Sequence, residues 1–103
     1  MTPAELASKV RKIVGDMPVY LTFDIDALDP SAAPGTGTPV IGGPSTDTVR
    51  KVLRGLSGVN VVGADMVEVL PDKDPSNITS IAAAAITQDI MFLMNEARKT
   101  RKK

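Results

Sequence analysis

Residues 18–30 read PVYLTFDIDALDP, and this stretch decides the fold class of the chain. Residues 18–25 form a run of aliphatic, aromatic and β-branched side chains that is broken only by Asp24. Such a run is typical of a strand buried on both faces of a parallel sheet. Residues 59–69 show the same pattern, so the sequence predicts a second buried strand there.

Three helical patterns alternate with these strands. The first begins after Thr2, a capping residue that is followed by Pro3, and Glu5 completes a capping box. Apolar residues then recur at helical spacing up to Gly15, which is a typical helix stop. The sequence therefore predicts that the chain opens with an amphipathic helix.

The second helix follows Ser45 or Thr46, either of which can cap it, and the third follows Asp74 with Pro75 at its first position. The resulting order is α-β-α-β-α, and a strand-helix-strand connection implies two parallel strands. Two buried parallel strands need neighbours on their edges. We therefore predict an α/β fold that is part of a larger three-layer αβα parallel-sheet domain.

Composition narrows the classes of function. The 103 residues include 12 basic and 12 acidic side chains, so net charge gives no support for a nucleic-acid partner or an anionic membrane surface. The basic tail at 98–103 is explained by a solvated helix end that complements the helix dipole. The apolar runs are too short to span a bilayer, and the absence of cysteine favours a cytoplasmic location.

The chain also has no histidine, so its chemistry must use carboxylates, hydroxyls, lysine or arginine. Asp24 and Asp26 end the first strand at a spacing that points strand side chains the same way. Two close carboxylates suit a hard divalent ion such as Mn²⁺ or Mg²⁺. The alternative is that both residues only accept hydrogen bonds from loop amides. A calcium loop of the EF-hand type is excluded, because its sixth position would be Asp29 rather than glycine.

Glu68 ends the second predicted strand and is the third candidate. Because parallel strands end at the same edge of a sheet, its carboxylate can face the same cleft as Asp24 and Asp26. A free carboxylate there suits a planar, donor-rich cation such as guanidinium. An exposed acid at a strand end is the alternative interpretation. Asp65, in the same strand, is a weaker candidate that would support the site residues without binding metal or substrate itself.

Residues 29–44 hold four prolines and four glycines, which predicts an ordered loop without helix or strand. The glycines at 35 and 37 do not form a nucleotide-binding loop, because they neither follow a strand closely nor open a helix. A rigid loop that lines a pocket fits the pattern better.

Several blocks together resemble the ureohydrolase family of arginases and agmatinases. They are VYLTFDIDALDP at 19–30, APGTGTP at 33–39 with the glycines at 42 and 43, VGADMVEV at 62–69, and the segment that begins at 74 and 75. The blocks match in order from about residue 18 onward, and the sequence of residues 62–69 is more similar to agmatinases than to arginases. The resemblance identifies residues 1–103 as the carboxyl-terminal portion of a ureohydrolase domain.

The resemblance implies a site with two Mn²⁺ ions that hydrolyses a guanidino compound, agmatine above all, to urea and an amine such as putrescine. It implies that Asp24 bridges the two ions and that Asp26 binds one of them. It further implies that Glu68 holds the guanidinium group, with Thr38 in the pocket wall. It also implies that the full-length protein is a homo-oligomer.

The family's remaining metal ligands lie in two histidine-containing blocks upstream, and neither block occurs here. We therefore expect this chain alone to be inactive, as a fragment, a truncated product or a remnant. The sequence leaves two alternatives open. One is a non-catalytic subunit that pairs with other chains. The other is an Asp-nucleophile phosphatase, although the motif of that class has Thr or Val at the position where this chain has Leu28.

Overall fold

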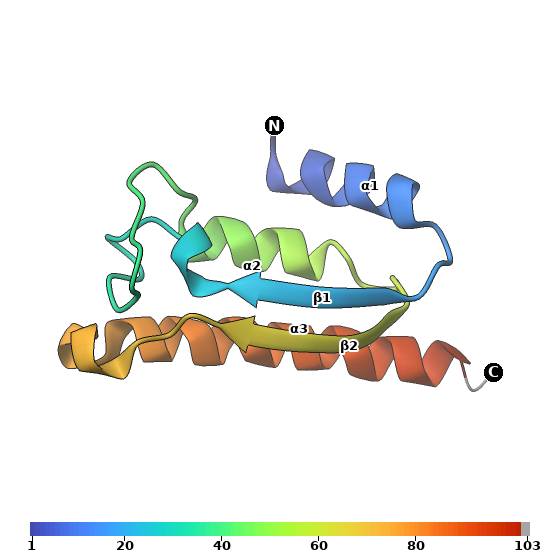
Figure 1. Ribbon diagram of the computed structural model, residues 1–103. Helices are drawn as coiled ribbons and strands as arrows, with labels where there is room; N and C mark the ends of the chain where they lie inside the picture. The colour runs from blue at the N-terminus through green and yellow to red at the C-terminus, as the bar shows by residue number, and fades with distance from the viewer. Residues whose placement is uncertain (102–103) are drawn as a thin grey trace.

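The computed structural model describes residues 1–101 and has the predicted order of three helices and two strands (Figure 1). Short 3₁₀ turns lie between the main elements. The elements are α1 (Pro3–Val14), β1 (Val19–Asp24), η1 (Ile25–Ala27), α2 (Thr46–Arg54), β2 (Val61–Val67), η2 (Pro71–Lys73), η3 (Pro75–Asn77) and α3 (Ile78–Arg101).

The two strands form a parallel pair, as the sequence predicts. Thr22 pairs with Asp65 and Asp24 pairs with Val67, so both strands end at the same edge of the sheet. In Figure 1 this edge, the loop at 29–44 and the start of α3 all lie at one end of the molecule. The parallel register therefore brings segments that are far apart in sequence to one place.

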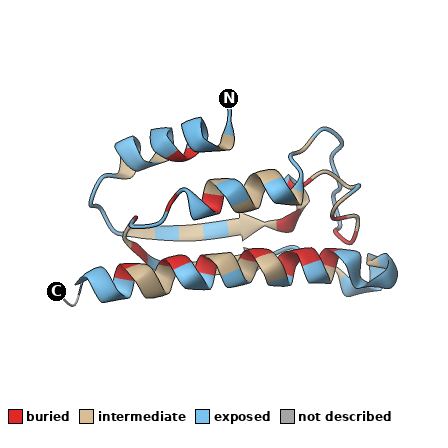
Figure 2. Cartoon of the chain, turned by 180° about the vertical axis from the view of Figure 1, so that it is seen from behind, coloured by how far each residue is buried: buried red, intermediate tan, exposed pale blue. Residues whose placement is uncertain are grey.

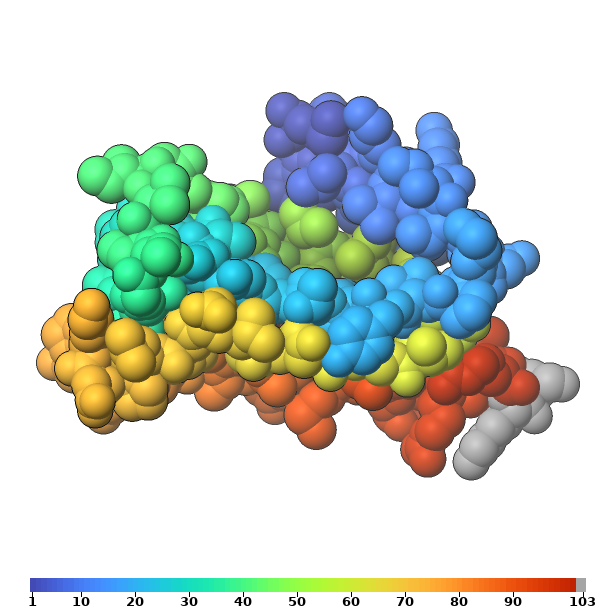
Figure 3. Space-filling view, in the orientation of Figure 1, coloured from blue at the N-terminus to red at the C-terminus, as the bar shows by residue number. Residues whose placement is uncertain are grey.

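Among the described residues, helices cover one face of this sheet and leave the other open. Leu21, Phe23, Ala64 and Met66 pack against the core on the face that α2 and α3 cover, and Figure 2 shows a strand that runs between these two helices. The opposite face carries Tyr20, which is 61% exposed, and in Figure 3 the strands lie uncovered across it. Residues 1–101 thus form a two-stranded parallel sheet with a helical layer on one face, which are two of the three layers of the predicted fold.

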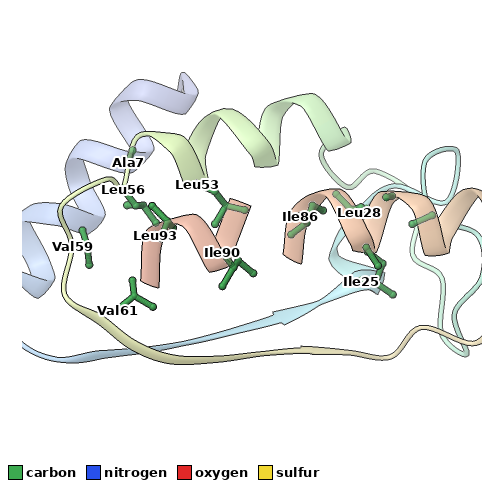
Figure 4. Close-up of a cluster of buried hydrophobic side chains, with 13 residues drawn as sticks. Ala7, Ile25, Leu28, Leu53, Leu56, Val59, Val61, Ile86, Ile90 and Leu93 are labelled. Carbon is green, nitrogen blue, oxygen red and sulfur yellow. The ribbon is translucent and has the colours of Figure 1, made fainter. Parts of the chain in front are cut away.

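Most of the core side chains come from α3 and the segments that face it. Ile86, Ile90 and Leu93 of α3 are buried, and they are part of one cluster with Ile25 and Leu53 (Figure 4). Residues 75–101 would satisfy the length and apolar composition of a membrane span. In this fold the helix packs on β2 and α2 and buries Ile86, Ile90 and Leu93, whereas Ile81, Met91 and Phe92 on the same helix are exposed.

The third helix begins later than predicted. Pro75 opens a short 3₁₀ turn rather than α3, because Ser76 and Asn77 have left-handed backbones with φ of 53° and 61°. Asp74 still caps the helix across this turn, since its carboxylate accepts hydrogen bonds from the Thr79 and Ser80 amides at 2.7 and 2.8 Å. Of the basic tail, residues 98–101 belong to α3, and 102 and 103 lie outside the described residues.

Candidate active site at the ends of the strands

Asp24 and Asp26 come together through a turn rather than along a strand. The strand β1 ends at Asp24, and Asp26 lies in the 3₁₀ turn η1 that follows. Asp24 caps this turn, because its Oδ1 accepts a hydrogen bond from the Asp26 amide at 3.0 Å. The predicted alternation of strand side chains is therefore the wrong reason for their proximity, and the amide contact belongs to the alternative interpretation of Asp24.

The charges of two neighbouring carboxylates act on Asp24. Partial burial raises the pKa of Asp24, although the hydrogen bond from the Asp26 amide opposes the shift. The nearby Asp26 side chain and the charge of Glu68 raise the pKa of Asp24 further. Neighbouring carboxylates repel each other when both are ionised, so a bound cation would stabilise their ionised form.

The loop at 29–44 brings Thr38 to the same cluster. The Thr38 hydroxyl donates a hydrogen bond to Asp26 Oδ2 at 2.8 Å. Asp29 ties the base of the loop together, since its amide donates to the Pro44 carbonyl and its Oδ1 accepts from the Gly42 amide at 2.9 Å. Hydrogen bonds from Ser31 and Gly42 lower the pKa of Asp29, so its carboxylate stays ionised. Thr38 is thus held against Asp26 by a closed loop.

Glu68 occupies an unusual backbone conformation directly after β2. Its φ is 73°, in the left-handed region that residues with a Cβ rarely adopt. The side chain is exposed, and its charge acts on Asp24. Non-glycine residues held in this region cluster at functional sites, where the surrounding structure sustains the strain. The sequence gives no direct signal for this backbone conformation.

Asp65 lies on the open face of the sheet, away from the helical layer. Its carboxylate accepts hydrogen bonds from the Tyr20 hydroxyl at 2.9 Å and from the Thr22 hydroxyl. These contacts tie β2 to β1 across the sheet. Any support that Asp65 gives to Asp24 therefore passes through the pairing of the two strands.

The donor chemistry fits a hard divalent ion only in part. Asp24 and Asp26 offer the carboxylate oxygens that such ions prefer. Within residues 1–101, however, no group of three or more His, Cys, Asp or Glu side chains is arranged to hold a metal. These two residues could therefore supply part of a coordination shell but not a complete one.

A buried hydroxyl was missed at the sequence level. Thr36 is 1% exposed, and its Oγ1 has no hydrogen-bond partner within the described part of the chain. Buried hydroxyls normally have a hydrogen-bond partner, so Thr36 is an exception. It lies in the loop between Gly35, which bonds to α3, and Thr38, which bonds to Asp26.

Known proteins resemble the chain over nearly its full length. Residues 1–93 match the family model described as "Arginase family". The chain is 54% identical over 97 residues to an agmatinase of Serratia proteamaculans, which covers 94% of this chain and 31% of that protein. An agmatinase of Photorhabdus laumondii is 56% identical over 97 residues, with the same shares covered. The chain thus spans about a third of the length of these relatives.

Solved structures share the fold. A hypothetical agmatinase from Burkholderia thailandensis matches with a TM-score of 0.89 and 51% identity, covering 95% of this chain and 31% of that one. Proclavaminate amidino hydrolase from Streptomyces clavuligerus matches with a TM-score of 0.90 and 40% identity, covering 93% and 32%. From its sequence and its fold, the chain belongs to the arginase family.

Proposed function

We propose that the chain forms the carboxyl-terminal part of a manganese-dependent ureohydrolase site that acts on a small guanidino compound. Agmatine is the proposed substrate, because the relatives named above include agmatinases that are 54% and 56% identical to this chain. The observation that carries the proposal is that Asp24 and Asp26 meet, and Glu68 follows β2, at the edge where the two parallel strands end.

Each side chain has a separate role in this proposal. Asp24 and Asp26 are metal ligands, and two Mn²⁺ ions, when bound, supply charge stabilisation and an activated water. Thr38 orients Asp26 through the 2.8 Å hydrogen bond to its Oδ2. Glu68 accepts hydrogen bonds from the guanidinium group and balances its charge. Water adds to the guanidinium carbon, a proton from the water passes to the alkyl-bearing nitrogen, the bond from the carbon to that nitrogen breaks, and urea and putrescine leave.

The chain alone is proposed to be inactive. Two carboxylates cannot complete the coordination shells of two ions, and the chain spans only about a third of its relatives. The complete site is proposed to lie in a cytoplasmic homo-oligomer. A non-catalytic role, as a partial subunit or remnant, is the second candidate, and it rests on the same incomplete set of ligands. Membership of the arginase family leaves no support for the phosphatase alternative.

A chimera tests the proposal. This chain would replace the matching third of the Serratia proteamaculans agmatinase, to which it is 54% identical, and urea release from agmatine would be measured with Mn²⁺. We expect activity, and we expect Glu68→Gln to reduce turnover by roughly ten- to a hundredfold while Mn²⁺ content is unchanged. Asp26→Asn should instead lower Mn²⁺ content. Loss of metal in Glu68→Gln would contradict its role as the substrate contact.

A further inference from the structure

A chain of hydrogen bonds runs from the start of α3 to the loop that carries Thr38. Asp74 Oδ1 accepts from the Thr79 amide at 2.7 Å, and Thr79 Oγ1 accepts from the Gly35 amide at 2.7 Å. The Gly35 carbonyl accepts from the Leu70 amide, also at 2.7 Å. Gly35 is therefore bonded on one side to α3 and on the other to the segment that follows β2.

The contact at Gly35 is close-packed as well as hydrogen-bonded. A Cβ at this position would lie 2.7 Å from Asp74 Cβ and 2.9 Å from both Asp74 Cα and Thr79 Oγ1. Thr79 is fully buried, at 0% exposed. Only the bare backbone of a glycine can approach α3 this closely, so the loop has little freedom to shift here.

Asp74 is held in the ionised state that this arrangement needs. Desolvation acts to raise its pKa, but hydrogen bonds from Ser80 and Thr79 outweigh that effect and lower the pKa to about 2. Its second oxygen, Oδ2, accepts from both the amide and the hydroxyl of Ser80. The carboxylate thus fixes the first turn of α3, including the Thr79 hydroxyl that meets the loop.

We infer that Asp74 and Thr79 are positioning residues for the site, acting through Gly35 on both Thr38 and Glu68. Thr38 lies three residues after Gly35 and bonds to Asp26, while Glu68 lies two residues before Leu70. A backbone in the left-handed region is sustained by the structure around it. We assign this role at Glu68 to the hydrogen bond from the Leu70 amide to the Gly35 carbonyl. The inference rests on the proposed roles of Thr38 and Glu68.

Hydrogen–deuterium exchange of the full chain tests this without metal or substrate. Thr79→Val removes the hydroxyl that accepts from Gly35 and keeps the backbone amide that Asp74 caps. We expect roughly tenfold faster exchange in peptides covering 35–43 and 66–70, with the first turn of α3 still protected. Thr79→Ser keeps an acceptor and should restore protection. Thr87→Val, the same change further along α3, is the matched control and should leave both peptides unchanged.

A second variant separates positioning from simple helix capping. Asp74→Ala should speed exchange in the loop, in 66–70 and in the first turn of α3. Asp72→Asn, which removes an exposed charge from the same segment, should change none of them. If Asp74→Ala affects only the first turn of α3, or if Thr79→Val leaves 35–43 unchanged, the inference is wrong. Because exchange does not depend on turnover, this outcome is distinct from failure of the proposed enzyme activity.

Discussion

Replacing Gly35 by alanine perturbs the tightest contact between the loop and α3. The new methyl group would lie 2.7 Å from Asp74 Cβ and 2.9 Å from Asp74 Cα and from Thr79 Oγ1. These separations are well inside van der Waals contact, and Asp74 Cα is backbone that cannot rotate away. Either the loop or the start of α3 must move, which stretches the hydrogen bond from Gly35 to Thr79.

The cost follows from these contacts. Overpacking of this kind costs about 1–3 kcal/mol, and a weakened buried hydrogen bond adds about 1 kcal/mol. The expected loss in free energy of unfolding is therefore roughly 2–4 kcal/mol. In a domain of this size that loss lowers the melting temperature by at least about 8 °C.

Gly37→Ala is the matched control, because it makes the same change two residues away, where a Cβ would meet nothing within 4 Å. Thermal unfolding followed by circular dichroism, at one fixed chain concentration, would compare both variants with the parent. We expect Gly37→Ala to unfold within a few degrees of the parent. Equal melting temperatures for the two variants would refute the close approach of the loop to α3.

Two further outcomes follow from the backbone and the charges. Glu68→Gly should be more stable than Glu68→Ala by about 1 kcal/mol in urea unfolding, because only glycine adopts φ of 73° without strain. Equal stabilities of the two variants would argue against the left-handed backbone at this position. The pKa of folded Asp74, about 2, lies below its ordinary value of 3.8, so its stabilisation is complete above about pH 4 and is lost as the pH falls towards 2. Asp74→Asn should therefore flatten the acid side of the stability–pH profile, whereas Asp72→Asn should leave the profile as steep as that of the parent.

The sequence predicted the element order because local signals agreed with the tertiary structure. Thr2 caps α1 through the Glu5 amide at 3.1 Å, and Ser45 caps α2 through the Thr48 amide at 3.1 Å. The proline- and glycine-rich composition of 29–44 correctly predicted a segment without helix or strand. Both predicted strands are shorter in the structure, spanning Val19–Asp24 and Val61–Val67, because the turn η1 follows β1 directly and Glu68 leaves the extended conformation after β2.

The layout of the site was harder to predict, because it depends on contacts between distant residues. Alternation along a strand cannot anticipate the 3₁₀ turn at Asp26, and a single sequence gives no sign that Glu68 has a positive φ. The delayed start of α3 depends on two left-handed residues, Ser76 and Asn77, that no capping rule foresees. The partner of Asp65 is likewise set by strand register, which places Thr22 opposite it.

The central claim is that this chain holds one part of a ureohydrolase site and needs the rest for activity. The most direct measurement is urea release from agmatine across a Mn²⁺ titration, with the purified chain and the agmatinase chimera assayed side by side. We expect no turnover from the chain alone and Mn²⁺-dependent turnover from the chimera that Asp24→Asn abolishes. Turnover by the chain alone, lost in its own Asp24→Asn variant, would contradict the claim by showing that these residues build a complete site.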